Sequence, residues 1–183
     1  MSTAQLVIIV TRALVLFVLL IVAAFTDVAY GKIYNWLVYP AIVLGLVLGV
    51  LGQAVNAGRP DVVDSAAGLA AGAALFGFFF LRGWMGGADV KLAAAIGAIG
   101  GLSFFLVSLI YITLAGCIIA VTMLIWRGRF IESVVNSIVF FFRPAKLKKA
   151  MEESGKQAVM IPYGLAMAVG TMVAWYTWYT HYL

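Results

Sequence analysis

The chain has 183 residues, enough for one domain, which we expect to cover residues 1–183. It is 65% hydrophobic and only 10% charged. A soluble domain of this size could not bury so much apolar surface, so a lipid bilayer is the expected solvent. The net charge of +5 would suit nucleic-acid binding, but the basic residues stand between long apolar runs rather than on one face. We therefore expect contact with lipid and none with nucleic acid.

Six apolar segments follow one another along the chain. A spanning helix needs roughly 20 mostly apolar residues, so the pattern predicts an all-α integral membrane bundle of about six transmembrane helices. The third segment carries Gly68 and Gly72 at helical spacing, which predicts close helix contact. The fourth is short and stops at Gly100-Gly101. No basic residue precedes the first, which argues against a cleavable signal peptide. The segments are residues 6–24, 36–51, 62–81, 90–99, 102–126 and 159–179.

The stretch between the fifth and sixth segments has a different pattern. Residues 130–142 place apolar side chains at helical spacing, with polar side chains opposite them. The stretch is too short to span a bilayer comfortably, and Pro144 ends it. It predicts an interfacial amphipathic helix.

The distribution of basic residues predicts the orientation. Of the 12 Lys and Arg residues, all but Arg12 and Arg59 fall in the loops after the first, third and fifth helices. The positive-inside rule then places these three loops in the cytoplasm and both termini outside. The interfacial helix would also lie at the cytoplasmic face.

Two acidic residues adjoin membrane segments: Asp27 after the first helix and Asp89 before the fourth. The predicted topology brings both to the cytoplasmic boundary, where a carboxylate is costly enough to suggest a role. Taken singly, each has a structural explanation, since Asp89 could cap its helix and Asp27 could be a solvated loop residue. The other acids fall in loops: Asp61, Asp64, Glu132, Glu152 and Glu153.

A pair of neighbouring carboxylates can carry out peptide hydrolysis. Because two close carboxylates do not both ionise easily, one keeps a proton to polarise a carbonyl while the other activates water. Other catalytic mechanisms lack the residues that they need. The single histidine, His181, is predicted outside the membrane, and Cys117 is the single cysteine. The chain has no HExxH and no phosphate-binding glycine loop with Lys-Ser/Thr. We therefore expect an aspartic site without metal or cofactor.

Three stretches resemble the type IV prepilin peptidases, specifically the short branch that serves Flp-type (tight-adherence) pili. Residues 27–37 resemble the first-aspartate segment with its Ile-x-Asn-x-Leu tail, which includes Asn35. Residues 85–92 resemble the GxGD segment, and residues 161–166 resemble the Pro-Tyr-Gly start of the last helix. Ala88 stands where GxGD has its second glycine, and we expect it to be tolerated because Gly86 and Gly87 remain.

The resemblance implies an endopeptidase of the bacterial inner membrane with Asp27 and Asp89 as catalytic residues. It would cut the basic leader from a prepilin after a glycine, at the cytoplasmic face. The bifunctional members carry a cysteine-rich insertion that this chain lacks, so cleavage without methylation and without zinc is implied. Alternatives are a different aspartate-pair signal peptidase, a non-enzymatic scaffold for pilus assembly and a small transporter. The oligomeric state, including a homo-oligomer, is open.

Several residues beside the aspartates have both a supporting and an ordinary interpretation. Gly86 and Gly87 would let an extended substrate approach Asp89, or form a plain turn. Lys91 would bias the charge of Asp89, or simply obey the positive-inside rule. Asn35 would orient the turn after Asp27 and Pro162 would break the backbone beside the site; both also suit ordinary loop and helix-start positions.

Overall fold

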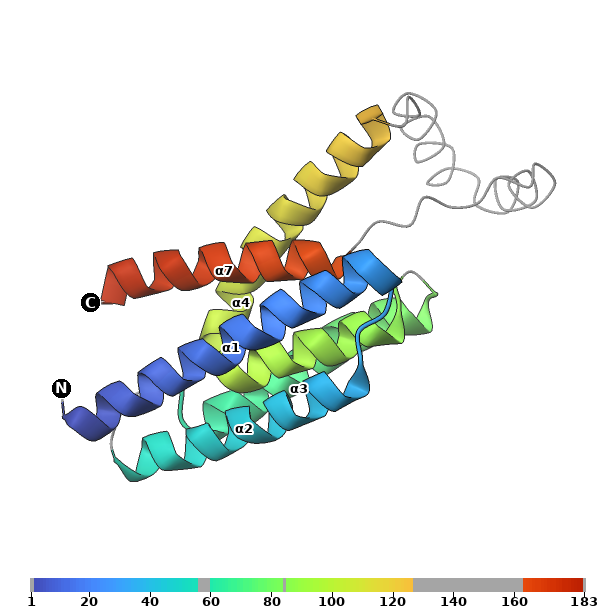
Figure 1. Cartoon of the computed structure of the whole chain (residues 1–183). Coiled ribbons are helices and arrows are strands. Elements are labelled where there is room, and N and C mark those ends of the chain that lie inside the picture. The colour runs from blue at the N-terminus through green and yellow to red at the C-terminus, as the bar shows by residue number, and fades with distance from the viewer. Residues whose placement is uncertain (1, 56–59, 84, 127–162, 183) are drawn as a thin grey trace. The chain divides into compact units, whose positions relative to one another are not determined.

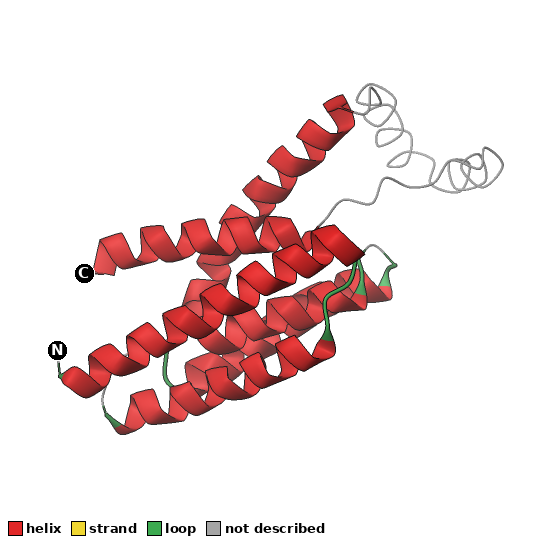
Figure 2. Ribbon diagram, viewed as in Figure 1, coloured by secondary structure: helices red, strands yellow, loops and turns green. Residues whose placement is uncertain are grey.

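The computed structural model describes residues 2–55, 60–83, 85–126 and 163–182. In these ranges all regular secondary structure is helical, and Figures 1 and 2 show the five helices. They are α1 (Thr3–Tyr30), α2 (Asn35–Ala54), α3 (Val62–Leu81), α4 (Gly87–Trp126) and α7 (Tyr163–Tyr182). Within the described part, α1, α2, α3 and α4 as far as Met123 are long and apolar enough to cross a membrane.

The prediction of an all-α membrane protein is thereby confirmed for the described residues, while the count of six helices stays a prediction. The proposed interfacial helix, residues 130–142, lies outside the described residues. By its contacts the chain divides into two units, Met1–Gly116 with Pro162–Leu183, and Cys117–Ile161. The core and the aspartates belong to the first unit, so that unit is the one described below.

Helix α1 is longer than its apolar run predicted. It begins at a capping box formed by Ser2 and Gln5, and ends at Gly31, whose φ of 61° is the left-handed conformation of a helix C-cap. No helix-breaking residue separates the apolar run from Gly31, so the helix continues through the polar residues. Asp27 therefore lies in the last turn of α1, and its interpretation as a loop residue is wrong.

The two faces of α1 differ in what they contact. One face is more than half exposed and faces the expected lipid: Leu14, Val18, Ile21 and Phe25. The other face is buried: Leu16, Leu19, Leu20 and Ala23. The spacing within each set is that of a helix with one side against a protein core, and an apolar exposed side is expected in a bilayer.

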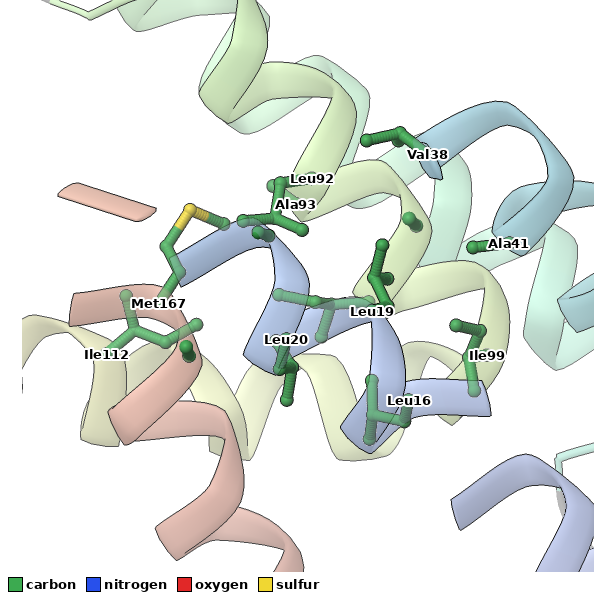
Figure 3. Close-up of a cluster of buried hydrophobic side chains, with 14 of the residues drawn as sticks. Leu16, Leu19, Leu20, Val38, Ala41, Leu92, Ala93, Ile99, Ile112 and Met167 are labelled. Atoms are coloured by element: carbon green, nitrogen blue, oxygen red, sulfur yellow. The ribbon is translucent and has the colours of Figure 1, made fainter. Parts of the chain in front are cut away.

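The first half of α4 lies at the centre of the bundle. Residues 92–100 are all buried, and a helix that is apolar on every side is one surrounded by others. Figure 3 shows Leu92 and Ile99 of α4 grouped with Leu19 of α1, Val38 of α2 and Met167 of α7. Asp89 stands at the beginning of this central helix, so a rigid, buried element holds it.

Glycines bring the neighbouring helices close to α4. A Cβ added at Gly68 of α3 would overlap the carbonyl oxygen of Gly97, and one at Gly72 would lie 2.6 Å from the carbonyl oxygen of Ala93. Each distance is too short for a real contact, so the two backbones meet where no side chain intervenes. The close packing predicted from Gly68 and Gly72 is therefore confirmed.

The break predicted at Gly100-Gly101 is a kink inside α4. Gly101 has φ 81° and ψ 173°, a conformation outside the helix that favours glycine. The Leu102 N–H donates to Oδ1 of Asp64 at 3.2 Å. Asp64 lies in the first turn of α3, which Asp61 caps by accepting from the Asp64 N–H at 2.8 Å. The placement of Asp64 in a loop is therefore wrong, because α3 already begins at Val62. The kink in α4 gives the Asp64 carboxylate its partner.

Candidate active site

Asp27 joins the end of α1 to the start of α7. Its side chain is half-buried, and its Oδ2 accepts a hydrogen bond of 2.7 Å from the main-chain N–H of Gly164. Its main-chain carbonyl accepts from the Gly31 N–H at 2.8 Å, which closes the last turn of α1. One residue thus ends a helix through its backbone and contacts another helix through its carboxylate.

Asp89 lies in the first turn of α4 and is also half-buried. Its main-chain N–H donates to the Gly86 carbonyl at 3.2 Å, so it is part of the helix rather than its cap. The interpretation of Asp89 as an N-cap is therefore wrong. Near a helix N-terminus the peptide dipoles favour a negative side chain, which makes this an electrostatically favourable place for a carboxylate.

The fold brings the two aspartates together although 62 positions separate their numbers in the chain. Asp27 and Asp89 interact electrostatically, and Asp89 interacts in the same way with Tyr163, the first residue of α7. Figure 1 shows the end of α1, the turn from α3 to α4 and the start of α7 at the same end of the bundle. The candidate site is therefore built from the ends of three helices.

Lys91 contacts α2. Its Nζ donates to Oδ1 of Asn35 at 2.8 Å and lies 5.7 Å from the centre of the Tyr39 ring. Among the described residues it forms no ion pair with Asp89. Lys91 and Asn35 thus link the start of α4 to the start of α2. Asn35 is the first residue of α2, so it takes the helix-start position rather than a loop position.

The glycines before Asp89 leave space beside its carboxylate. Gly86 is exposed, and a Cβ there would lie 3.4 Å from Oδ2 of Asp89. Neither Gly86 nor Gly87 has a positive φ. Ala88 is helical, a conformation that alanine adopts without strain, so the backbone at this position does not require glycine. Pro162 lies outside the described residues.

The partner of Asp27 was not found by sequence reasoning. The Pro-Tyr-Gly stretch marked the start of the last helix, and Gly164 is the donor. A main-chain N–H belongs to almost every residue, so no side chain in the sequence signals this role. The glycine itself was the available signal, because it permits the close approach that a hydrogen bond from the backbone requires.

A bundle of apolar helices with two neighbouring carboxylates at one end is the architecture of a multi-pass membrane protein with a candidate aspartate-pair site. The model of the type IV leader peptidase family matches residues 14–125, more than half of the chain, and this stretch includes Asp27 and Asp89. The chain belongs to the type IV leader peptidase family. No curated protein and no solved structure matches it. Family membership implies a membrane-embedded peptidase, in agreement with the family resemblance noted in the sequence.

Proposed function

We propose that the chain is an aspartic endopeptidase that removes the basic leader from Flp-type prepilins. The observation that carries this proposal is the position of the two carboxylates: Asp27 in the last turn of α1 and Asp89 in the first turn of α4 lie close enough for their charges to repel each other, at the ends of two apolar helices. Both residues lie within the stretch that matches the type IV leader peptidase family. The chain then acts as a single peptidase domain, without a methyltransferase activity.

The reaction needs one ionised and one protonated carboxylate. The ionised member takes a proton from water, and the hydroxide formed attacks the carbonyl carbon of the scissile peptide bond. The protonated member donates to the carbonyl oxygen. The tetrahedral intermediate collapses when the C–N bond breaks: the leaving nitrogen receives the proton that the first carboxylate took from water, and a hydroxyl proton of the intermediate returns to the second carboxylate as the carbonyl forms again. Such a pair titrates as one unit, so the roles belong to Asp27 and Asp89 together.

The position of the pair suits a substrate that is itself partly in the membrane. A prepilin with an apolar helix in the bilayer and a basic leader in the cytoplasm presents its scissile bond at the boundary between them. Asp27 and Asp89 lie in the terminal turns of helices long enough to span, which is where such a bond would be. Exposed Gly86 leaves room for an extended chain beside Asp89. We therefore propose that the site lies at the cytoplasmic face of a bacterial inner membrane, which is also the side that the positive-inside rule predicts.

The test is cleavage of a co-expressed Flp-type prepilin by the Asp27→Asn and Asp89→Asn variants, followed by the size of the pilin on gels. Loss of general acid–base catalysis predicts a rate lower by about 10²–10⁴-fold in each variant. Asp61→Asn is the matched control, since it removes a carboxylate from the start of α3. Asparagine caps a helix as well as aspartate does, so this variant should cleave normally.

Three outcomes would overturn the proposal. Normal cleavage by both aspartate variants would exclude the pair as the catalytic groups. Cleavage of a lipoprotein precursor but not of prepilin would indicate a different signal peptidase. Normal pilus assembly by both variants, with prepilin processed by another enzyme, would indicate a scaffold.

A further inference from the structure

Asp27 occupies a position where its helix does not favour a negative charge. It lies in the last turn of α1, where the exposed carbonyl groups give the helix end a partial negative charge. The hydrogen-bond donor that offsets this unfavourable position comes from the N-terminal end of another helix, α7. Gly164 is the second residue of α7, and first-turn N–H groups have no partner within their own helix. The 2.7 Å hydrogen bond gives a partner both to this first-turn N–H group and to the Asp27 carboxylate.

The absence of a side chain at position 164 is what allows this bond. A Cβ there would lie 2.8 Å from Oδ2 of Asp27, 2.9 Å from its Cγ and 3.0 Å from its Cβ. Contacts this short do not persist between real atoms, so either the carboxylate or the start of α7 would have to move. Any residue other than glycine would therefore separate the donor from its acceptor.

The start of α7 is itself held in place. The ring of Tyr163 packs against Phe76 of α3, with 6.3 Å between the ring centroids. Further along α7, Ala166 and Met167 are buried, and Gly170 lets the helix approach the backbone of Ile112. The Gly164 N–H is thus aimed by packing on both sides of it. Within the described residues, Oδ2 is the oxygen of the Asp27 carboxylate that accepts a hydrogen bond, and the donor is the main chain of Gly164.

We propose that Gly164 is a positioning residue for the peptidase reaction: its main-chain N–H orients the Asp27 carboxylate, and its lack of a side chain makes this contact possible. The inference rests on the proposed function of Asp27. Gly164 acts through that carboxylate rather than on the substrate itself. It also gives α7 a part in the site, although the family match ends at residue 125.

The kinetic test compares three glycine-to-alanine variants in the full chain. Gly164→Ala should lower kcat by about 10–100-fold, since a displacement of about 1 Å in a reacting group costs up to about 10²-fold. KM should stay within about twofold, because substrate contacts are unchanged. In Gly116→Ala the new methyl group would lie 3.7 Å from the Ala166 Cβ, an ordinary contact, so this variant should match the wild type.

Gly170→Ala controls for simple loosening of α7. Its methyl group would overlap the backbone of Ile112, so it should lower the thermal stability without a selective loss of kcat. The inference is wrong if Gly164→Ala keeps the wild-type kcat. It is also wrong if Gly164→Ala and Gly170→Ala show the same changes in thermal stability, kcat and KM.

A second measurement tests the contact without activity. With ¹⁵N-glycine labelling, the Gly164 amide proton should move upfield in Asp27→Ala, because a hydrogen bond to a carboxylate shifts it downfield; Gly170 serves as the unchanged reference. If the signal moves while the wild type cleaves no prepilin, the positioning is right and the proposed function fails. If prepilin is cleaved but neither the signal nor kcat responds, the positioning inference alone fails.

Discussion

Replacing Gly101 by alanine should destabilise the protein strongly, because two separate costs coincide at the kink of α4. The conformation of Gly101, φ 81° and ψ 173°, costs a residue with a side chain about 1–3 kcal/mol. The new methyl group would also lie 2.6 Å from Cβ of Pro60 and overlap the Asp64 carboxylate. Displacement of Asp64 weakens its bond to the Leu102 N–H, and bonds to charged groups contribute about 1.5–3 kcal/mol.

The two costs together predict a loss of about 2.5–6 kcal/mol in the free energy of unfolding. This is a large share of the roughly 5–15 kcal/mol that holds a typical protein folded. The loss would be measured by SDS titration in detergent micelles, followed by tryptophan fluorescence. Gly77→Ala is the control, since a methyl group there meets nothing within 4 Å and alanine favours a helix by about 1 kcal/mol.

A double-mutant cycle separates the backbone cost from the overlap. In an Asp64→Ala background, Gly101→Ala should cost less than in the wild type but still at least about 1–3 kcal/mol, because the overlap with the carboxylate is gone while the backbone cost and the close approach to Pro60 remain. Equal unfolding free energies for Gly101→Ala and Gly77→Ala would refute the reasoning. Full additivity in the cycle would leave the kink intact as an explanation but remove Asp64 from it.

Two further predictions concern polar contacts between helices. Arg12 is only 4% exposed and its Nη2 donates to the Leu48 carbonyl at 2.7 Å. Arg12→Met should therefore cost about 1.5–3 kcal/mol in the SDS titration. Thr11→Val, which removes only a solvent-exposed hydrogen bond to the Val7 carbonyl of the same helix, should cost little, and equal effects would contradict the prediction. Lys91→Met breaks a solvent-exposed bond to Asn35, so it should cost no more than about 1 kcal/mol. Adding Asn35→Ala to Lys91→Met should lower the unfolding free energy little further, because the bond is already broken. A second loss as large as that of Asn35→Ala alone would show that Lys91 and Asn35 are not coupled.

Pattern and composition predicted the features that depend on many residues at once. Apolar runs of spanning length indicated membrane helices, and Gly68 and Gly72 indicated the close contact of α3 with α4. The two aspartates beside apolar runs could be singled out because charge is rare in such segments. Helix ends were predicted less well, since α1 continues past its apolar residues to Gly31, and hydropathy alone does not mark where hydrogen bonding stops.

The sequence by itself determined the class of protein, the apolar segments and the pair of carboxylates, because hydrophobic length and isolated charge can be read locally. Tertiary structure decided which groups those carboxylates meet. Asp27 binds the Gly164 N–H, and Asp64 binds the Leu102 N–H. Both donors are main-chain groups released at a helix start or a kink, and both partners lie far away in the chain. Apart from a nearby glycine, such contacts leave no mark in the residue types, because almost every residue carries a main-chain donor and only the fold decides which one is free.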